Sequence, residues 1–222
     1  MATLRSKFKT LVERRAPKLA APLRCRHLIR HSNSYLVQTG FLRTLERNLP
    51  VDVEGKPLAF LNYPILSLLE ERLKSDFRVL EFGSGFSTAF WSSRVKEVVA
   101  VEHDEQWHQR VKEMIADTSN VRLLLIPLGP DYPRAATQVG GEFQLILIDG
   151  RMRTECARHC LPHLAANGVI LWDDSSRAHY QEGITELEQQ SFRTLRLQGL
   201  KPAGFSIDET AIFYRDNNCL GL

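Results

Sequence analysis

The stretch VLEFGSGFSTAFW, residues 79–91, decides the fold of this chain. Its first residues form a short apolar run typical of a strand that is buried on both faces. Gly83 and Gly85 end that run, and Ser87 and Thr88 then begin a predicted helix. A strand that passes through a glycine turn into a helix is the first unit of an open α/β sheet, whose ligands lie at the carboxyl ends of the strands.

The same pattern of strand and helix repeats along the chain. Apolar runs rich in Val, Ile and Leu occupy 78–82, 97–101, 121–126, 143–148 and 168–172, and helices are predicted over 87–94, 104–116 and 152–164. Two further strands, 192–200 and 210–215, lie too close in sequence for a crossover helix, so they should pair antiparallel. We therefore expect a Rossmann-like, doubly wound α/β fold with five parallel strands and a terminal antiparallel hairpin.

The first residues of the chain differ in charge from the remainder. Residues 1–31 contain nine of the 29 Lys and Arg residues but one of the 26 Asp and Glu residues, so a basic arm precedes a mildly acidic body. Apolar residues at helical spacing in 3–15 predict a short basic amphipathic helix that Pro17 and Pro22 would end. The arm could contact a membrane surface or nucleic acid, or serve as a targeting segment. Termini more often lie solvated or partly packed on the body, which is the interpretation we favour.

The composition is that of an ordinary soluble protein, with 43% hydrophobic and 25% charged residues. A chain of 222 residues suits one domain, which we place at 32–222 with a helical extension over 32–76 and its clearest helix at 66–73. Four scattered cysteines do not suggest a disulfide scaffold, and no apolar run approaches the ~20 residues of a membrane span. No signal-peptide pattern is visible, so we expect a cytoplasmic protein, for which a homo-oligomer is compatible with the sequence.

The glycine loop and the next strand together indicate a nucleoside ligand. Gly83 can adopt torsions that other residues avoid, and Gly85 leaves room for a ligand against the backbone. The free N–H groups of the helix start, beside Ser87, face the same place. Glu102 ends the second strand, 17 residues after Gly85, where a carboxylate can accept both hydroxyls of a ribose.

Glu81 distinguishes between two classes of nucleoside ligand. The dinucleotide fingerprint needs a third small residue where this chain has Thr88, and the Glu81 carboxylate would repel a pyrophosphate. The same carboxylate favours a cationic ligand, and the amino group and sulfonium of S-adenosylmethionine are both cationic. We therefore expect this cofactor; the alternative is a tight turn that binds nothing.

Four stretches, VLEFGSG, VVAVEHD, FQLILIDG and LPHLAANGVILWDD, resemble successive motifs of the class I S-adenosylmethionine-dependent methyltransferases, over roughly residues 60–215. The chain is also similar to a narrower group of these enzymes with Tyr63–Pro64 before the glycine loop and Glu-His-Asp after it. The resemblance implies a seven-stranded sheet, with His103 near the adenine. The residues that we assign to the cofactor are Glu81, Gly83, Gly85, Ser87, Glu102, His103 and Asp149.

Three carboxylates should meet at the same edge of the sheet, because Asp149 ends the fourth strand and Asp173 and Asp174 end the fifth. Clustered carboxylates repel one another unless a cation or proton joins them, and hard oxygen ligands suit Mg²⁺. Catechol and caffeoyl-CoA O-methyltransferases, to which this part of the chain is partly similar, hold a divalent metal with an Asp and an Asp-Asn pair. Here Asp174 replaces the Asn, and Met152 replaces a lysine of those enzymes.

These departures leave three interpretations of the carboxylates open. They either hold Mg²⁺ and act in catalysis, or Arg151 or Arg153 folds back and neutralises them without a metal. In the third interpretation Asp149 contacts the cofactor or the protein, and Asp173 caps the loop that follows it. If an arginine neutralises the carboxylates, His103, His179 or Tyr180 could take the proton of the acceptor. Cys156, His159, Cys160 and His163 are predicted to share one helix, so they cannot surround a zinc ion.

The sequence therefore predicts a methyltransferase that acts on a small-molecule hydroxyl, carboxyl or amine, with Tyr63 and Trp172 as acceptor contacts. A nucleic-acid substrate is not expected, because the fourth strand ends in IDGR rather than in an Asn-Pro-Pro-Tyr type of motif. Two alternatives stay open: aminopropyl transfer from the decarboxylated cofactor, and a protein that binds the cofactor without catalysis. The sequence does not name the acceptor.

Overall fold

The computed structural model describes residues 16–222, and the chain divides into two compact units, 1–56 and 57–222. Residues 32–56 thus belong to the first unit, whereas the sequence placed the domain boundary at residue 31. The amphipathic helix predicted over 3–15 lies outside the described residues.

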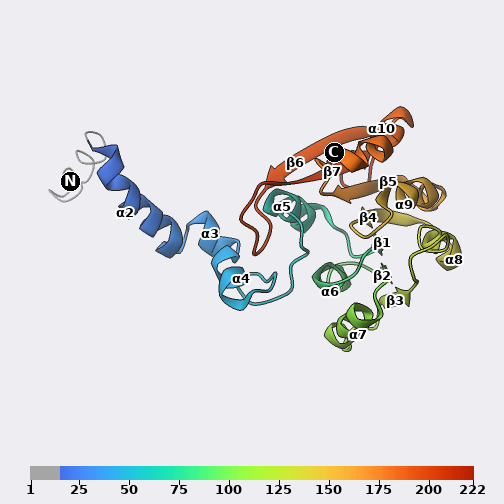
Figure 1. The fold of residues 1–222 in the computed structure, drawn as a ribbon, viewed down its shortest axis with the longest axis horizontal. Coiled ribbons are helices and arrows are strands. Elements are labelled where there is room, and N and C mark those ends of the chain that lie inside the picture. The colour runs from blue at the N-terminus through green and yellow to red at the C-terminus, as the bar shows by residue number, and fades with distance from the viewer. Residues whose placement is uncertain (1–15) are drawn as a thin grey trace. The chain divides into compact units, whose positions relative to one another are not determined.

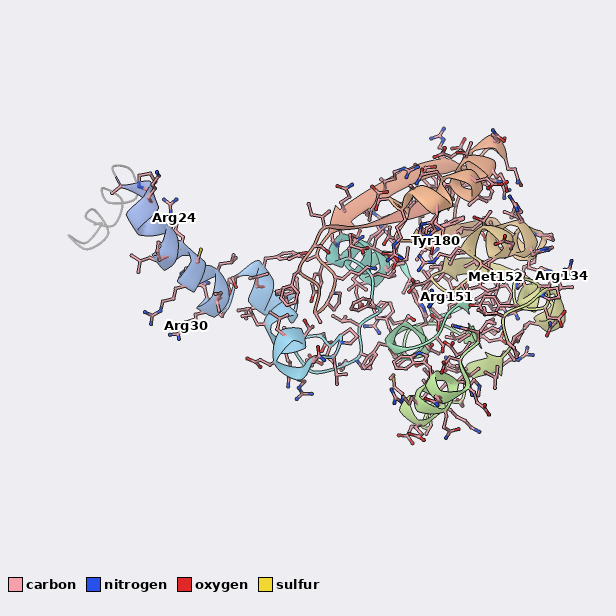
Figure 2. The ribbon with its side chains drawn as sticks, in the orientation of Figure 1. Arg24, Arg30, Arg134, Arg151, Met152 and Tyr180 are labelled. Atoms are coloured by element: carbon pink, nitrogen blue, oxygen red, sulfur yellow. The ribbon has the colours of Figure 1, made fainter. Side chains whose placement is uncertain are left out.

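The described part of the first unit contains the helices α2 (Pro17–Arg30), α3 (Tyr35–Gln38) and α4 (Phe41–Arg47). Pro17 starts α2, because the first helical position needs no N–H donor, and Pro22 lies inside the helix. The prediction that these prolines end the helix over 3–15 stays a prediction, because that stretch lies outside the described residues, but Pro22 does not end α2. Arg24 and Arg30 project from α2, which has no acidic residue in its sequence (Figure 2). None of the described helices is long and apolar enough to cross a membrane.

Residues 57–222 form a seven-stranded sheet in the order β3-β2-β1-β4-β5-β7-β6. The strands are β1 (Arg78–Phe82), β2 (Glu97–Glu102), β3 (Val121–Leu125), β4 (Phe143–Ile148), β5 (Leu164–Asp173), β6 (Arg193–Gly199) and β7 (Asp208–Tyr214). The first five strands run parallel, and β7 pairs antiparallel with both β5 and β6. This arrangement confirms the predicted fold class, including the terminal hairpin.

Helices cover both faces of the sheet (Figure 1). One face carries α6 (Phe86–Ser92) and α7 (Glu105–Met114), and the other carries α8 (Ala135–Val139), α9 (Arg153–Cys160) and α10 (Gln181–Gln189). The unit begins with α5 (Tyr63–Arg72), and the short turns η1 (Leu161–His163) and η2 (Ala178–Tyr180) precede β5 and α10. The helix predicted over 152–164 is shorter than expected, because Leu164 already pairs with Phe143 at the start of β5.

The central strands form the core because they are apolar on both sides. Leu80, Ile146 and Ile170 are fully buried, as are most of their neighbours on β1, β4 and β5. Each such side chain contributes about 1.5–3 kcal/mol of transfer free energy, which fixes the strands relative to one another. The packed core consequently holds the strand ends, and the loops that follow them, in place.

The carboxyl ends of β1, β2 and β4 meet at one edge of the sheet. The N–H of Gly83 donates to the carbonyl of Val101 at 2.9 Å, and the N–H of Asp149 donates to the carbonyl of Phe82 at 3.1 Å. These hydrogen bonds tie the loop after β1 to both neighbouring strands. Any ligand of this edge would therefore face all three loops.

Candidate functional site

Two glycines shape the loop after β1. Gly83 has a φ of +95°, and a Cβ at this position would lie 3.3 Å from the backbone of Gly150, so the torsion and the neighbouring loop both disfavour a side chain. Gly85 has φ 157° and ψ −137°, a region that almost only glycine occupies. A Cβ on Gly85 would face the ring of Trp107 at 3.5 Å. That Gly85 borders the ligand stays a prediction; the indole that a side chain here would face itself lines the neighbouring cavity.

Glu81 lies fully buried at the floor of this loop. One carboxylate oxygen accepts a hydrogen bond from the Thr88 hydroxyl, and the other accepts one from Trp91 Nε1 at 3.1 Å. Burial raises the pKa of Glu81 to about 7, although the hydrogen bonds of α6 act in the opposite direction. The side chain therefore anchors the start of α6 and places a carboxyl group, easily converted between its neutral and charged forms, beneath the loop.

Glu102 at the end of β2 is held by three donors. Its Oε2 accepts from the Ser84 hydroxyl at 2.9 Å, and its Oε1 accepts from the N–H groups of His103 and Asp104 at 2.8 and 2.9 Å. His103 Nδ1 lies 3.0 Å from the same Oε1. The carboxylate is only 3% exposed, so its orientation is fixed before any ligand binds.

Trp107, on the first turn of α7, is a neighbour of this site that the sequence analysis missed. Its indole Nε1 donates to the carbonyl of Ser84 at 2.8 Å, and its backbone N–H donates to Asp104 at 2.7 Å. The sequence predicts that a helix begins at Asp104, but it does not indicate that the Trp107 side chain points toward the glycine loop. The result is a flat aromatic group beside the glycine loop.

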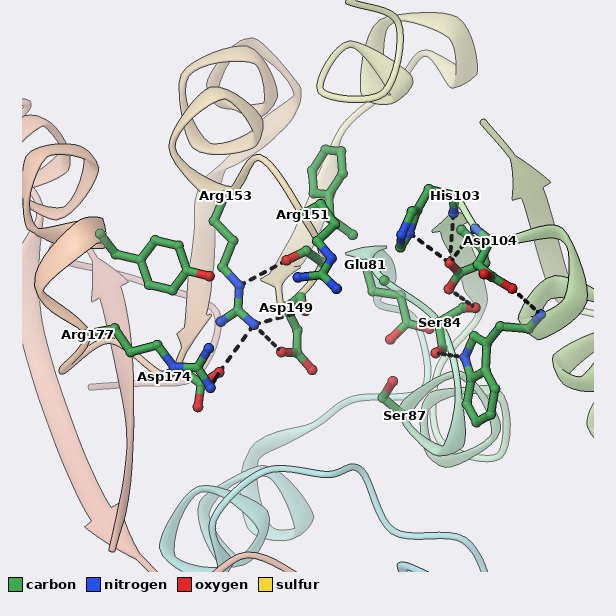
Figure 3. A pocket seen from close by; sticks show the side chains of 16 residues that line it. Glu81, Ser84, Ser87, His103, Asp104, Asp149, Arg151, Arg153, Asp174 and Arg177 are labelled. Atoms are coloured by element: carbon green, nitrogen blue, oxygen red, sulfur yellow. Dashed lines mark hydrogen bonds and ion pairs between the residues drawn. The ribbon is translucent and has the colours of Figure 1, made fainter. Parts of the chain in front are cut away.

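These loops border a cavity of about 430 Å³, a usual size for a small-molecule site (Figure 3). Glu81, Ser84, Ser87 and His103 lie toward one side of it, and Asp149 and the arginines lie toward the other. The complete lining is Glu81, Phe82, Gly83, Ser84, Ser87, Glu102, His103, Asp104, Trp107, Asp149, Gly150, Arg151, Arg153, Asp174, Arg177 and Tyr180. All of these residues come from the second unit of the chain.

The three predicted carboxylates do come together. Asp149, Asp173 and Asp174, here called the acidic rim, each offer an oxygen within 4.8 Å of the others. Arg153, which is only 6% exposed, crosses the rim from the start of α9. Its Nη2 lies 2.9 Å from Asp149 Oδ1 and 3.3 Å from Asp174 Oδ2, and its other donors reach the carbonyls of Gly150 and Asp173. One of the two arginines that the sequence offered as counter-ions thus takes this role.

A lysine from the loop between β6 and β7 is the second cation of the rim. Lys201 Nζ lies 2.7 Å from Asp173 Oδ2, 3.4 Å from Asp174 Oδ1 and 3.0 Å from Asp208 Oδ2. The other oxygen of Asp173 accepts from the Thr210 hydroxyl at 2.8 Å. Partial burial opposes the charge of Lys201, but the ion pair with Asp173 raises its pKa above the usual value.

The environments of the rim carboxyls differ. Burial and the charge of Asp173 raise the pKa of Asp149 well above its usual range, against the opposing effect of Arg153. Burial also acts on Asp174, but Lys201, Arg153 and Arg177 outweigh it and lower its pKa. Of Asp149 and Asp174, Asp149 is consequently the one that more readily takes a proton.

A second cavity, of about 260 Å³, adjoins the first. The two share Asp149, Asp174 and Arg177 in their linings. The remaining lining residues of the second cavity are Phe60, Asp173, Lys201, Gly204, Ser206 and Asp208. The acidic rim therefore lies where the two cavities meet, and Asp149 lines both of them.

Two predicted acceptor contacts lie elsewhere. Tyr63 is 5% exposed on the first turn of α5, where its N–H donates to the carbonyl of Leu200, and Trp172 is fully buried against Phe213. Neither lines a described cavity at the carboxyl edge, so both assignments are corrected to the core. Tyr180 does line the larger cavity, whereas His179 is exposed and outside both linings.

A family model described as a methyltransferase domain matches residues 80–175. This stretch of the chain is therefore a methyltransferase domain, and the seven-stranded sheet around it is the Rossmann-like fold of S-adenosylmethionine-dependent methyltransferases. The match covers the glycine loop, Glu102 and the acidic rim, and the cofactor of the family is S-adenosylmethionine. No curated protein matches the methyltransferase in sequence.

Solved structures agree with this fold at low sequence identity. An rRNA methylase from Streptococcus thermophilus is 20% identical over 71% of this chain and 100% of its own, with a TM-score of 0.55. A precorrin-6y C5,15-methyltransferase from Geobacter metallireducens is 16% identical over 68% of this chain and 87% of its own, with a TM-score of 0.53. Aeropyrum pernix fibrillarin with natively bound S-adenosyl-L-methionine is 14% identical over 67% and 74%, with a TM-score of 0.52. The shared feature is the fold alone.

Proposed function

We propose that this enzyme transfers the methyl group of S-adenosylmethionine to a hydroxyl, carboxyl or amine of a small molecule. The observation that carries the proposal is the pair of adjoining cavities, of about 430 and 260 Å³, that meet at Asp149 and Asp174. The larger cavity suits the cofactor, and the smaller has room for a small acceptor only. Transfer needs donor and acceptor side by side, which this arrangement provides.

The residues of the larger cavity fit the cofactor. Glu102 offers a preoriented carboxylate for the ribose hydroxyls, and Trp107 and His103 offer ring faces for the adenine. Gly83 leaves the backbone of the loop open beside the buried carboxyl of Glu81, whose negative form would attract the cofactor's amino group. When bound, the cofactor supplies an electrophilic methyl group; the protein supplies position and charge.

Asp149 is the residue best placed to handle the proton of the acceptor. It borders both cavities, and its Oδ1 is held by Arg153 at 2.9 Å. No contact of Asp149 Oδ2 is found among the described residues, so this oxygen is available to an acceptor hydroxyl or ammonium. Burial and the charge of Asp173 raise the pKa of Asp149, which makes it a better proton acceptor than an ordinary aspartate.

Mg²⁺ does not fit the rim as the structure has it. The Asp173 oxygens already contact Lys201 and Thr210, and Asp149 Oδ1 and Asp174 Oδ2 contact Arg153. A divalent ion on these oxygens would have to displace a buried ammonium or guanidinium group and would meet its positive charge at close range. We therefore assign no step to a metal.

Methyl transfer from cofactor labelled in the methyl group tests the proposal. The full-length protein would be offered hydroxyl, carboxyl and amine acceptors, together with structured RNA, and the products identified by mass spectrometry. We expect label in a small molecule, and a loss of about 10²–10⁴-fold in Asp149→Asn with unchanged S-adenosylhomocysteine affinity. Asp117→Asn, an exposed turn position, is the matched control.

Several results would contradict the proposal. Label in RNA but in no small molecule would overturn the acceptor class. Product formation from decarboxylated cofactor alone would indicate aminopropyl transfer. Full turnover in Asp149→Asn would remove that residue from the chemistry.

A further inference from the structure

The contacts of Lys201 saturate its ammonium group. An ammonium group has three N–H donors, and the carboxylates of Asp173, Asp208 and Asp174 lie within ion-pair distance, at 2.7, 3.0 and 3.4 Å. The side chain is 9% exposed. Lys201 therefore has no donor left over for a ligand, and its charge is used entirely within the protein.

Lys201 also contacts two of the three carboxylates that a divalent ion would need. The three oxygens of the acidic rim that could serve together as metal ligands lie within 4.8 Å of one another. Lys201 contacts Asp173 and Asp174, while Arg153 contacts Asp149 and Asp174. The Thr210 hydroxyl donates a hydrogen bond to the other oxygen of Asp173 and in turn accepts one from Asn62 Nδ2 at 3.2 Å. The cation position is thus built into the hydrogen-bond network of the fold.

Lys201 belongs to a segment of the chain that also lines the smaller cavity, the proposed acceptor site. It follows β6, in the segment 200–207 that leads to β7, and the preceding carbonyl of Leu200 accepts from Tyr63 N–H at 2.9 Å. Gly204 and Ser206 of the same segment line the smaller cavity. The Lys201 ammonium also lies 5.3 Å from the ring centroid of Phe60, another lining residue. Its ion pairs consequently hold one wall of this cavity against the end of β5.

We propose that Lys201 is a built-in cation that takes the place of a divalent metal at the acidic rim and positions the 200–207 wall of the acceptor cavity. The rim of this enzyme thus carries its own counter-charges without any added ion, and the acceptor is aligned by protein groups alone. The functional meaning of the wall rests on the proposed function, but the cation role does not.

Manganese binding tests the cation role without cofactor or acceptor. Free Mn²⁺ would be followed by electron paramagnetic resonance during titration of the full chain. We expect no stoichiometric uptake by the wild-type protein, uptake of one Mn²⁺ per chain by Lys201→Met, and loss of that uptake in Lys201→Met/Asp173→Asn. Arg177→Met is the matched control, since it removes a rim cation that is half exposed and contacts Asp174 but not Asp173. We expect no uptake by this variant.

The outcomes separate the inference from the proposed function. Stoichiometric Mn²⁺ uptake by the wild type that disappears in Asp173→Asn would overturn the inference, and so would a folded Lys201→Met that takes up none. Equal Mn²⁺ uptake by Arg177→Met would overturn the inference, because removal of either cation would then open the rim to a metal. If circular dichroism shows that Lys201→Met is unfolded, Lys201→Gln replaces it in the same titration, and the wild-type result still decides whether the rim excludes metal.

A kinetic measurement tests the positioning role once an acceptor is known. Excess chelator should leave wild-type turnover unchanged. Lys201→Met should raise the acceptor KM more than it changes the S-adenosylhomocysteine affinity, and Lys201→Arg should restore part of the loss. A variant with unchanged acceptor KM would contradict the role of Lys201 in positioning the wall.

Discussion

At the scale of the residue, the site depends on carboxyl groups that the fold holds in different environments. Glu102 is nearly buried but accepts hydrogen bonds from three donors, whereas Glu81 is fully buried with its oxygens bound to α6. The rim carboxyls face two internal cations. Carboxyl groups thus serve to accept the ribose hydroxyls, to anchor a helix and to accept a proton, depending on their partners.

Glu81 should make the stability of the ligand-free protein depend on pH. Its pKa is about 7 in the folded protein against 4.5 as the ordinary value, so between these pH values the folded state binds more protons than the unfolded state. The free energy of unfolding should therefore fall as pH rises through this window, by up to roughly 1.4 kcal/mol per pH unit from this group.

Urea unfolding of wild type and Glu81→Gln between pH 5 and pH 8 measures this effect. Glu81→Gln cannot titrate, so the wild type should lose stability relative to it as pH rises. Glu113→Gln, at an exposed position of α7, should keep the wild-type slope. Parallel curves for wild type and Glu81→Gln would show that burial does not raise the pKa of Glu81.

At the scale of the element, the loop between β1 and α6 connects the core to the site. Its backbone is tied to β2 and faces the loop after β4, so a change in the loop reaches both strands. The torsions of this loop were foreseeable from the two glycines in the sequence. The identity of the groups they accommodate, the Gly150 backbone and the Trp107 ring, required the structure.

Gly83→Ala should destabilise the enzyme by about 2–4 kcal/mol, since it combines an unfavourable torsion with a close approach to the backbone. Gly140→Ala is a matched control, because Gly140 has a φ of +73° but no atom within 4 Å of a Cβ. It should cost only about 1 kcal/mol, the torsional part. Denaturant unfolding and S-adenosylhomocysteine titration would be measured on both. Equal losses would mean that the contact with Gly150 has no effect of its own.

The strand ends could be predicted from the sequence, whereas contacts that depend on the path of a loop could not. Strand periodicity placed Glu102 and Asp149 at the edge, because a strand end is visible as the end of an apolar run. Trp172 was wrongly assigned to the acceptor because successive side chains of β5 point to opposite faces, and Asp173 takes the edge position. Lys201 could not be paired with Asp173 from the sequence, because their contact depends on how the β6–β7 hairpin folds back.

At the scale of the whole molecule, every residue that lines the two cavities at the carboxyl edge belongs to the unit 57–222. The basic helix α2 belongs to the other unit and contributes to neither lining. Cofactor binding and the basic arm should therefore be separable functions of the chain.

A truncation that starts at Ser32 should bind S-adenosylhomocysteine as the full chain does, within about twofold, because it removes no lining residue. Calorimetry on both proteins measures this. A large loss of affinity would mean that the arm completes the cofactor site. Salt-sensitive pelleting of the full chain with anionic vesicles, absent in the truncation, would instead support a membrane-surface role for the arm.

We infer that the cavity at the ends of β1, β2 and β4 holds S-adenosylmethionine with its ribose against Glu102. The most direct test is a calorimetric titration of the full chain with S-adenosylhomocysteine, for wild type, Glu102→Gln and the control Glu113→Gln. We predict one site per chain, wild-type affinity in Glu113→Gln, and a loss of about 1–3 kcal/mol in Glu102→Gln, which keeps an oxygen for the loop N–H groups but loses the charge. No binding by the wild type, or equal affinity in wild type and Glu102→Gln, would contradict this placement of the cofactor.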